Sequence, residues 1–449
     1  MEIQDVIQQY HDLLTDEVAE EANALLHEKL KERSLYFGER PLCIVLRPHF
    51  YQEHDWEFMQ RGLQGVLSAF SRAHEVCIAD KSYRSQLHLE EYEEHLFPLD
   101  YGAPLPWSSS RIDTFYVVED RNLKCVEYNA ETPAGIGYND CLADVFDALE
   151  PMKKFQEMYH LTPMRSLDTL QSALMKAYHG WGGREIPQIA ILDWQDVPTL
   201  NEHEITRLYF EQHGYKAILA DPRALEYRNG QLMHGDFRID LIYKRVLYSE
   251  LVERMGVDNP VLQAIKDRAV YMTNAPSAKL MAKKASLAFL SDERNADLFT
   301  SEQQHFINAH IPWTRVVEER KTIYDGQAVD LVQCIADNRE KFVLKPNDEY
   351  GGSGVVLGWQ SSQEEWESKL QLALNTPHVV QEKVQLLQRD FPNWADGRLT
   401  ISERYVDAAP YIFNGDQVYG CLTRLSPLAL LNVTAGGGSV VPTYIIRNR

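Results

Sequence analysis

The sequence has no hydrophobic run long enough to cross a membrane. A transmembrane helix needs roughly 20 consecutive apolar residues, and no apolar run in these 449 residues approaches that length. The N-terminal residues Met1-Glu2-Ile3-Gln4-Asp5 are acidic and lack the features of a signal peptide. We therefore expect a soluble cytoplasmic protein without a membrane partner, and the length suggests two or three domains.

Cysteine pairs and an excess of positive charge are missing as well. The six cysteines are scattered and form no C-x-x-C pair, a pattern that predicts buried free thiols rather than disulfides or a metal site. The formal net charge of −21 argues against a nucleic-acid partner, because binding nucleic acid requires a basic surface. A cationic small substrate is compatible with this charge, although solubility alone explains it.

Two common nucleotide-binding motifs, G-x-G-x-x-G and G-x-x-x-x-G-K-[ST], do not occur. A different glycine-rich loop is present between two β-like runs. Lys345-Pro346 leads into it, and its tip is Gly351-Gly352-Ser353-Gly354. Glycines let the backbone bend sharply and let its amides approach an anion, and Lys345 adds an ammonium. We interpret this segment as a phosphate-binding loop; the alternative is a plain glycine hairpin with a solvated lysine.

Hydrophobic periodicity predicts the elements of the N-terminal half. We expect two helices in the first thirty or so residues, the second capped at Thr15-Asp16. We further expect a buried strand over residues 42–46, an amphipathic helix over 56–70, and two strands between Asp113 and Asn129 that flank a polar turn at residues 119–122.

From Ile186 the pattern changes to alternating strands and helices. We expect strands over residues 188–192, 216–220 and 239–243, a helix over 202–213, and a hairpin turn at Asn229-Gly230. This pattern predicts a small α/β unit with a parallel sheet. Strands dominate again after Ile311. The expected domains are residues 1–180, 181–270 and 271–449.

A candidate Mg²⁺ site lies on the two strands between Asp113 and Asn129. Glu127 and Asn129 are two residues apart on a strand, so their side chains leave the same face, and carboxylate and amide oxygens suit Mg²⁺. A loop with an odd number of residues places Asp113 opposite Asn129 on that face, whereas an even loop turns Asp113 away. Arg111 projects in the same direction as Asp113 and is suited to clamp a transferring phosphoryl group. The alternative is a solvated, charged hairpin.

Other segments supply candidate contacts to ATP. Helical spacing places Lys279 and Lys283 on one face and turns Lys284 elsewhere, and the sequence does not choose among them. Three residues of a predicted strand are placed along an adenine, where a carboxylate can hold the ribose hydroxyls; they are Gln381, Glu382 and Lys383. Arg424 is a candidate for binding an acyl phosphate or a substrate carboxylate, with a structural salt bridge as the alternative.

Together these motifs resemble the circularly permuted ATP-grasp proteins related to glutathionylspermidine synthetase, without an amidase domain. That family has an Arg-x-Asp pair followed by Glu-Tyr-Asn-Ala, matched here by Arg111, Asp113 and residues 127–130. The resemblance implies that Asp113, Glu127 and Asn129 hold Mg²⁺ and that Arg111 stabilises the transferring phosphate.

The resemblance also covers the nucleotide-binding side. It implies that Lys345 and residues 351–354 hold phosphate, together with Lys283 or Lys284. The order, with metal ligands before the phosphate loop, is that of the permuted proteins. The resemblance extends from about Arg47 to the end, and residues 434–439 also look like family sequence.

One segment departs from the family. Its Asn-Ala-Asp-Ser-Ala-Ser run reads Asn129-Ala130-Glu131-Thr132-Pro133-Ala134 here. The resemblance therefore does not carry glutathione or spermidine over as substrates.

The expected fold is α/β (α+β), a circularly permuted ATP-grasp with an inserted glutathione-synthetase-like α/β substrate domain. The expected function is an ATP- and Mg²⁺-dependent ligase that joins a small carboxylate to a small amine through an acyl phosphate. The alternatives are an ATP-dependent small-molecule kinase and a non-catalytic nucleotide-binding protein. The oligomeric state stays open.

Overall fold

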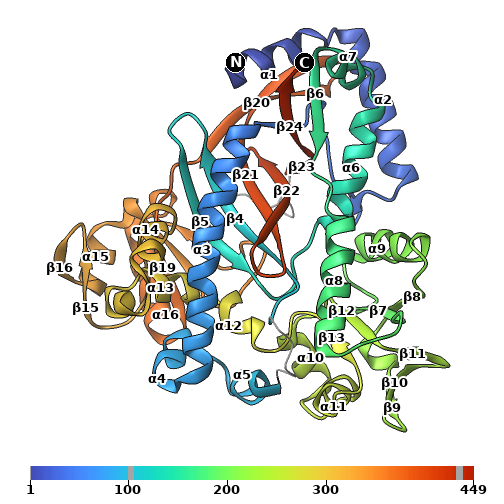
Figure 1. Cartoon of the computed structure of the whole chain (residues 1–449). Helices are drawn as coiled ribbons and strands as arrows, with labels where there is room; N and C mark the ends of the chain where they lie inside the picture. Colours follow the sequence, from blue (N-terminus) through green and yellow to red (C-terminus); the bar gives the residue numbers. More distant parts are fainter. Residues whose placement is uncertain (1, 100–105, 431–437) are drawn as a thin grey trace.

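Strands from both ends of the chain form one antiparallel sheet in the computed structural model, which describes residues 2–99, 106–430 and 438–449. The strands of this central sheet are β4 (Ser109–Val117), β5 (Asn122–Asn129), β20 (Leu387–Ala395), β21 (Arg398–Phe413), β22 (Gln417–Ser426) and β23 (Ser439–Val441). Their order is β23-β22-β21-β4-β5, with β20 pairing with β21 (Figure 1). The C-terminal strands thus lie beside the candidate metal-binding strands. Of the tail motif noted in the sequence, residues 434–437 lie outside the described residues.

The N-terminal helices form as predicted. They are α1 (Ile3–Asp12) and α2 (Asp16–Glu32), and the Thr15 side chain accepts a hydrogen bond from the Val18 N–H at 3.3 Å to cap the second. The helix predicted over residues 56–70 is confirmed and is longer, α3 (Glu53–Ala79). It packs on one face of the central sheet (Figure 1), where the ring of Phe70 lies 4.5 Å from that of Tyr128.

The strand predicted over residues 42–46 is not formed. Most of these residues are buried, but their backbone is irregular. Their backbone bonds go to separate neighbours: the Leu46 N–H donates to the Pro392 carbonyl, and the Val440 N–H donates to the Leu42 carbonyl. Hydrophobicity predicted the burial correctly, whereas strand formation depends on a continuous partner edge, which the apolar pattern does not report.

The remaining elements of the N-terminal half lie partly at the top and partly at the bottom of the molecule as drawn in Figure 1. The helices are α4 (Lys81–Arg84), α5 (Glu91–Leu96), α6 (Ile136–Ala148), α7 (Glu150–Met158) and α8 (Leu167–Trp181), and a short hairpin is made by β1 (Tyr36–Phe37) and β2 (Arg40–Pro41). A three-stranded sheet joins the C-terminal strand β24 (Thr443–Asn448) to β3 (His49–Gln52) and β6 (Tyr159–Pro163).

The predicted α/β unit is present and its sheet is parallel. The strands are β7 (Ile189–Leu192), β8 (Ala217–Ala220), β12 (Leu241–Lys244) and β13 (Tyr271–Met272), in the order β13-β12-β7-β8. The associated helices are α9 (Leu200–Gln212), α10 (Tyr248–Met255) and α11 (Pro260–Lys266), and an antiparallel meander is made by β9 (Glu226–Arg228), β10 (Gln231–His234) and β11 (Phe237–Ile239). Asn229 and Gly230 form the β9–β10 turn with φ of 52° and 72°, as predicted. We call residues 189–272 the parallel-sheet module.

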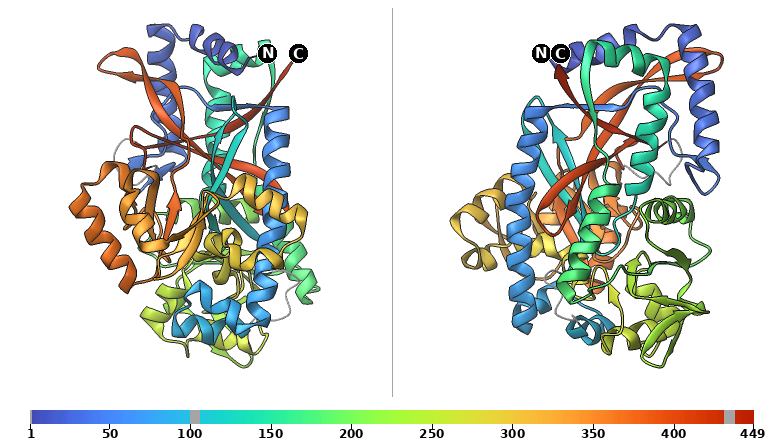
Figure 2. Two further views of the ribbon diagram at one scale, coloured as in Figure 1. Left: turned by 90° about the vertical axis from the view of Figure 1, so that its left-hand side faces the viewer. Right: turned by 45° about the vertical axis from the view of Figure 1, so that its right-hand side comes forward.

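A second antiparallel sheet carries the predicted phosphate loop. Its strands are β14 (Thr314–Val316), β19 (His378–Glu382), β17 (Phe342–Pro346) and β18 (Val356–Leu357), in the order β14-β19-β17-β18. The elements around it are α12 (Ala278–Ala282), α13 (Ala285–Ser291), α14 (Ser301–His310), β15 (Lys321–Tyr324), β16 (Gln327–Asp330), α15 (Leu331–Asp337) and α16 (Gln363–Asn375). Figure 2 shows most of this lobe on the opposite side of the central sheet from the parallel-sheet module.

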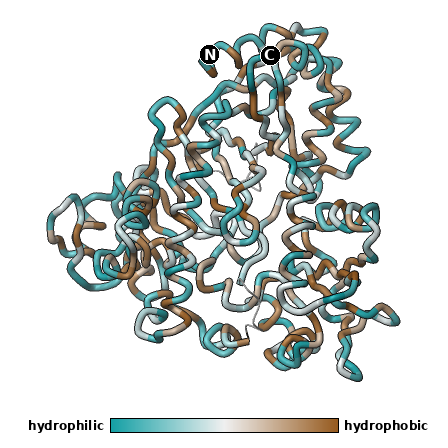
Figure 3. Tube along the Cα trace, viewed as in Figure 1, coloured by the Kyte–Doolittle hydropathy of each residue, from teal (hydrophilic) through white to brown (hydrophobic). Residues whose placement is uncertain are grey.

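Hydrophobic segments are short and alternate with hydrophilic ones along the whole trace (Figure 3). Of the helices formed by residues 2–99, 106–430 and 438–449, none combines the length and hydrophobicity of a transmembrane span. All six cysteines are free, and five of them are buried, which confirms the prediction of buried thiols.

Candidate active site

A cleft between the central sheet and the phosphate-loop sheet collects most of the predicted site residues. Its lining has many polar and charged residues, which are Arg111, Asp113, Glu127, Asn129, Lys284, Lys345, Glu349, Gly351, Gly352, Gln381, Glu382, Asp407 and Arg424. The apolar residues of the lining include Phe115, Val343, Val355, Leu357, Trp359, Val384 and Leu386. A lining with both kinds of residue suits a nucleotide, which has a flat base and charged phosphates.

A β-bulge aligns the predicted metal ligands. The hairpin pairs Val117 with Asn122, so its loop has an even number of residues, and this register alone would turn Asp113 and Glu127 to opposite faces. Pairing shifts by one residue between Thr114 and Asp113, where Val126 is passed over and Asp113 comes opposite Glu127. The odd loop that would place Asp113 opposite Asn129 is not formed, and Asn129 pairs with Arg111 instead. The bulge nevertheless returns Asp113 to the face of the sheet that Glu127 and Asn129 share.

Asp113 lies at the centre of a hydrogen-bond cluster. Its oxygens accept from Arg111 Nε at 2.8 Å and Nη2 at 3.2 Å, and from Asn129 Nδ2 at 3.1 Å. Arg424 Nη2, from β22, donates to the same carboxylate at 2.7 Å. Burial alone would raise the pKa of Asp113, but Arg111 and Arg424 hold it well below its usual range. Asp113 is therefore an anion in the free protein.

Arg424 is shared between two carboxylates. Its Nε donates to Asp407 at 2.7 Å, and its backbone N–H donates to the other oxygen of Asp407 at 3.0 Å. Burial raises the pKa of Asp407, with Arg424 opposing that effect and Asp113 adding to it. The Asp407 carboxylate thus fixes the plane of the Arg424 guanidinium beside Asp113.

Two lysines line the cleft close to Glu127. Lys284 Nζ lies 2.9 Å from an Oε of Glu127 and also donates to the Glu349 carbonyl of the phosphate loop. Lys345 Nζ donates to Gln381 Oε1 at 2.7 Å and to the carbonyl of the bulged Val126 at 3.2 Å. Burial lowers the pKa of Lys345 to about 8, with nearby Lys284 contributing and Glu127 opposing.

The structure separates the candidate lysines. Lys283 is buried and pairs with Glu93 at 2.7 Å and with Asp348 at 3.4 Å. Lys279 shares these partners, with Asp348 at 2.7 Å, so the predicted common face of the two holds. Lys284 points the other way, into the cleft, whereas Lys283 lines a different pocket behind the loop.

The phosphate loop has the conformation that its glycines permit. Gly351, Gly352 and Gly354 have φ of 64°, 76° and 67°, in the left-handed region that favours glycine. Gly351 and Gly352 line the cleft. Ser353 and Gly354 instead line the pocket on the far side of the loop, so only the first half of the predicted tip faces the lysines.

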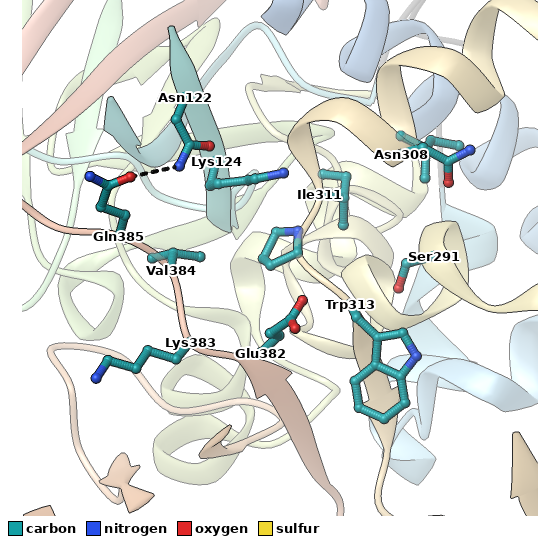
Figure 4. Close-up of a pocket in the computed structure, with 12 residues that line it drawn as sticks. Asn122, Lys124, Ser291, Asn308, Ile311, Trp313, Glu382, Lys383, Val384 and Gln385 are labelled. Atoms are coloured by element: carbon teal, nitrogen blue, oxygen red, sulfur yellow. Dashed lines mark hydrogen bonds between the residues drawn. The ribbon is translucent and has the colours of Figure 1, made fainter. Parts of the chain in front are cut away.

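The end of β19 separates the cleft from a second pocket. Glu382 and Val384 line both cavities, whereas Lys383 and Gln385 line only the second, together with Lys124 and the Trp313 ring (Figure 4). The Lys383 ammonium lies 4.4 Å from the ring centroid of Trp359. Gln381 and Glu382 therefore line the cleft. Lys383, the third predicted ATP contact on this segment, does not line it, and its ammonium instead lies over Trp359.

The oxygen set fits a magnesium ion that phosphate and water complete. No group of three or more His, Cys, Asp or Glu side chains arranged to hold a metal occurs in the described parts of the chain. Here two carboxylates, Asp113 and Glu127, converge with the Asn129 amide. Mg²⁺ usually takes one or two protein carboxylates and fills its octahedron with phosphate oxygens and water.

Sequence reasoning missed several residues of the cleft. Asp407 gave no motif signal, because its role depends on the pairing of β21 with β22, which brings it opposite Arg424. Phe115, Trp359 and Leu386 are apolar residues on separate elements, and local patterning identifies them only as candidates for burial.

Comparisons with known proteins give a family for this chain. Residues 112–426 match the model of the family described as circularly permuted ATP-grasp type 2. The chain is 24% identical over 441 residues to an uncharacterised protein of Synechocystis sp., covering 89% of this chain and 84% of that protein. It is 22% identical over 446 residues to an uncharacterised protein of Mycobacterium tuberculosis, covering 90% and 74%.

Two further similarities are to a shorter segment and to a solved structure. A putative glutamate–cysteine ligase 2-2 of Frankia casuarinae is 28% identical over 216 residues, which cover 45% of this chain. The matched segment spans only 23% of the length of that relative. A glutathione synthetase-like effector from Globodera pallida, solved in its apo form, matches with a TM-score of 0.58 at 12% identity, over 99% of this chain and 98% of that chain. The structural likeness shows a shared fold, and the family match shows that the chain belongs to the circularly permuted ATP-grasp type 2 family.

Proposed function

We propose that the protein is an ATP- and Mg²⁺-dependent ligase that joins a small carboxylic acid to a small amine. The observation that carries the proposal is the convergence in one cleft of an oxygen set from the N-terminal part and a cationic, amide-lined cradle from the C-terminal part. Membership of the ATP-grasp family supports nucleotide use, and the name of the Frankia relative supports a ligase.

The apolar and the charged lining residues have separate roles in this proposal. The adenine lies among Phe115, Trp359 and the other apolar residues, with Gln381 and Glu382 at its edge. Lys345, Lys284 and the amides of Gly351 and Gly352 hold the phosphates. Asp113, Glu127 and Asn129 hold Mg²⁺, which when bound offsets charge on the phosphate oxygens.

The chemistry has two balanced steps. A carboxylate oxygen of the acid attacks the γ-phosphorus of ATP, so that ADP leaves and an acyl phosphate forms. The amine nitrogen then attacks the acyl carbon, the C–O bond to phosphate breaks, and the nitrogen loses a proton as the amide forms. Arg111 and Arg424 are aimed at the oxygens that gain charge, and most of the acceleration comes from positioning and electrostatic stabilisation.

The domain division and the substrates belong to the same proposal. We assign residues 1–180 to the N-terminal helices and the metal-binding strands, 181–270 to substrate binding, and 271–449 to nucleotide binding. The substrates are small molecules in a cytoplasmic enzyme.

An ADP-release assay across panels of acids and amines tests the reaction class. A ligase forms ADP fast only when both substrates are present, whereas a small-molecule kinase needs one acceptor. A protein that only binds nucleotide forms no ADP. Glu127→Ala is expected to abolish ADP formation in a folded protein because a metal ligand is lost. Asp120→Ala, on the exposed turn of the same hairpin, is the matched control and is expected to keep full activity; full activity in Glu127→Ala would refute the metal assignment.

A further inference from the structure

A single peptide group connects Arg111 to the parallel-sheet module. Arg111 Nη1 donates to the Ala134 carbonyl at 2.9 Å. The N–H of the same peptide unit, that of Gly135, donates to Glu202 Oε1 at 2.7 Å. The peptide is trans, so its C=O and N–H point in opposite directions. Carboxylate, peptide and guanidinium thus form one continuous hydrogen-bonded chain.

Close packing and hydrogen bonds hold the Ala134–Gly135 peptide in a single orientation. Gly135 has φ of +103°, and a Cβ there would lie 2.8 Å from the Tyr411 hydroxyl oxygen, so only glycine fits. The Tyr411 hydroxyl also donates to the Ala134 carbonyl, at 3.3 Å. Glu202 is buried and comes from α9, which packs beside α6 (Figure 1).

The same segment is held at several other points by residues from the module's strand ends and just beyond it. Arg245, directly after β12, donates to the Pro133 carbonyl. The Tyr248 N–H donates to Glu131 at 2.7 Å, and Asn274 Nδ2 donates to the Glu131 carbonyl at 2.8 Å. Residues 131–135, which follow β5, are therefore anchored to the carboxyl-terminal edge of the parallel sheet.

We infer that Glu202 is a positioning residue for phosphoryl transfer: it holds the Ala134–Gly135 peptide, and that peptide fixes the Arg111 guanidinium. The inference rests on the proposed function of Arg111. A buried carboxylate polarises the peptide that donates to it, which makes the peptide carbonyl a stronger acceptor for the arginine. The module therefore sets the orientation of Arg111 without reaching the cleft itself.

Three variants separate this role from general stability. Glu202→Ala removes the acceptor of the Gly135 N–H. Glu202→Gln keeps an oxygen acceptor of the same reach and is expected to restore most of what the alanine variant loses. Glu204→Ala is the matched control, because Glu204 lies on the same helix, pairs with Arg207 at 2.6 Å and is half exposed.

Two readouts are needed. In the ligase assay, Glu202→Ala is expected to lower kcat by about 10- to 100-fold, the size of effect that a misplacement of about 1 Å produces, while the KM for ATP stays near that of the wild type. Independently of activity, the Nε–H signal of Arg111 in arginine side-chain NMR spectra, identified by its loss in Arg111→Lys, is expected to shift in Glu202→Ala and to return in Glu202→Gln.

The outcomes distinguish the two hypotheses. If the wild-type protein forms no ADP with any substrate pair, the proposed function fails, and the NMR comparison still decides the role of Glu202. An unchanged Arg111 signal in Glu202→Ala overturns the inference. Equal impairment of the alanine and glutamine variants, with a matching fall in thermal stability, also overturns it, because that result indicates a purely structural role.

Discussion

The ammonium of Lys284 lies 2.9 Å from a carboxylate oxygen of Glu127, so a lysine proposed to bind phosphate neutralises a proposed metal ligand in the free protein. Asp113 is likewise neutralised, by Arg111 and Arg424. In the complex proposed above, Lys284 would leave the Glu127 carboxylate for a phosphate oxygen, and Glu127 would then be free to hold Mg²⁺.

Replacing Lys284 by methionine is expected to change metal and nucleotide affinity in opposite directions. Without its internal cation, Glu127 attracts a divalent metal more strongly, so the nucleotide-free variant should bind Mn²⁺ about 10-fold more tightly, the equivalent of about 1.4 kcal/mol. ATP should bind at least as much more weakly, because one phosphate contact is lost. Electron paramagnetic resonance titration of Mn²⁺ and calorimetric titration of ATP measure the two effects.

The control for Lys284→Met is Lys369→Met. Lys369 is exposed on α16 and lines the pocket behind the phosphate loop rather than the cleft. Both affinities should stay at their wild-type values in this variant. Wild-type Mn²⁺ affinity in Lys284→Met would show that the lysine does not compete with the metal.

Replacing Asp407 by asparagine is expected to lower kcat by about 10- to 100-fold, which corresponds to a charge-assisted hydrogen bond of about 1.5–3 kcal/mol. An Asn amide has one acceptor oxygen, so it cannot accept from both Arg424 Nε and the Arg424 N–H as the two Asp407 oxygens do, and the guanidinium loses its fixed plane. The KM for ATP should change little. Steady-state kinetics measure both, and Asp416→Asn, exposed at the β21–β22 turn, should behave as the wild type. An unchanged kcat in Asp407→Asn would remove the orienting role.

The sequence predicted which residues line the cleft better than it predicted how the backbone brings them together. Alternation on strands placed Glu127 and Asn129 on one face, and motif order placed the phosphate loop opposite them. The alignment of Asp113 with Glu127 depends on a bulge at Val126 that compensates for an even loop. A bulge changes the strand pairing without changing the pattern of apolar residues, so the local sequence does not indicate it.

The lysines show the same limit. Helical spacing grouped Lys279 with Lys283 and set Lys284 apart, and the structure has that grouping. Which of these lysines lines the cleft depends on the break between α12 and α13 and on the buried Glu93 that pairs with Lys283. That pairing is a tertiary contact between distant segments, which local patterning does not report.

Replacing Gly354 by alanine is expected to weaken ATP binding by about 10-fold or more. At φ of +67° an L-residue costs about 1–2 kcal/mol, and the new Cβ would lie 2.6 Å from Cγ of Pro346, which shifts the loop next to Lys345. Gly397→Ala is the matched control: its φ is +71° and a Cβ there meets nothing within 4 Å. Both variants should lose stability, Gly354→Ala more because of the contact with Pro346, and only Gly354→Ala should lose ATP affinity in calorimetric titration. Equal ATP affinities would show that the loop tolerates the shift.

His49, which lies outside the cleft, is expected to make the stability of the protein depend on pH. Its ring is buried on β3, and within the described residues neither ring nitrogen has a hydrogen-bond partner. Burial holds the pKa of His49 well below its usual value, and Arg47 and Arg389 add to the shift. Below about pH 6.5 the His49 ring is therefore protonated in the unfolded chain but stays neutral in the folded protein. The free energy of unfolding is at its full value above about pH 6.5 and falls as the pH drops below it.

Replacing His49 by leucine removes this proton-linked loss. Between pH 6 and pH 4 the wild type should lose about 1.4 kcal/mol more unfolding free energy for each pH unit than His49→Leu, the slope expected for one proton. Urea unfolding at a series of pH values measures the difference. His27→Leu, on the exposed face of α2, should keep the wild-type slope, since that ring is solvated in both states. Parallel pH profiles for the wild type and His49→Leu would mean that the buried ring accepts its proton without unfolding the chain.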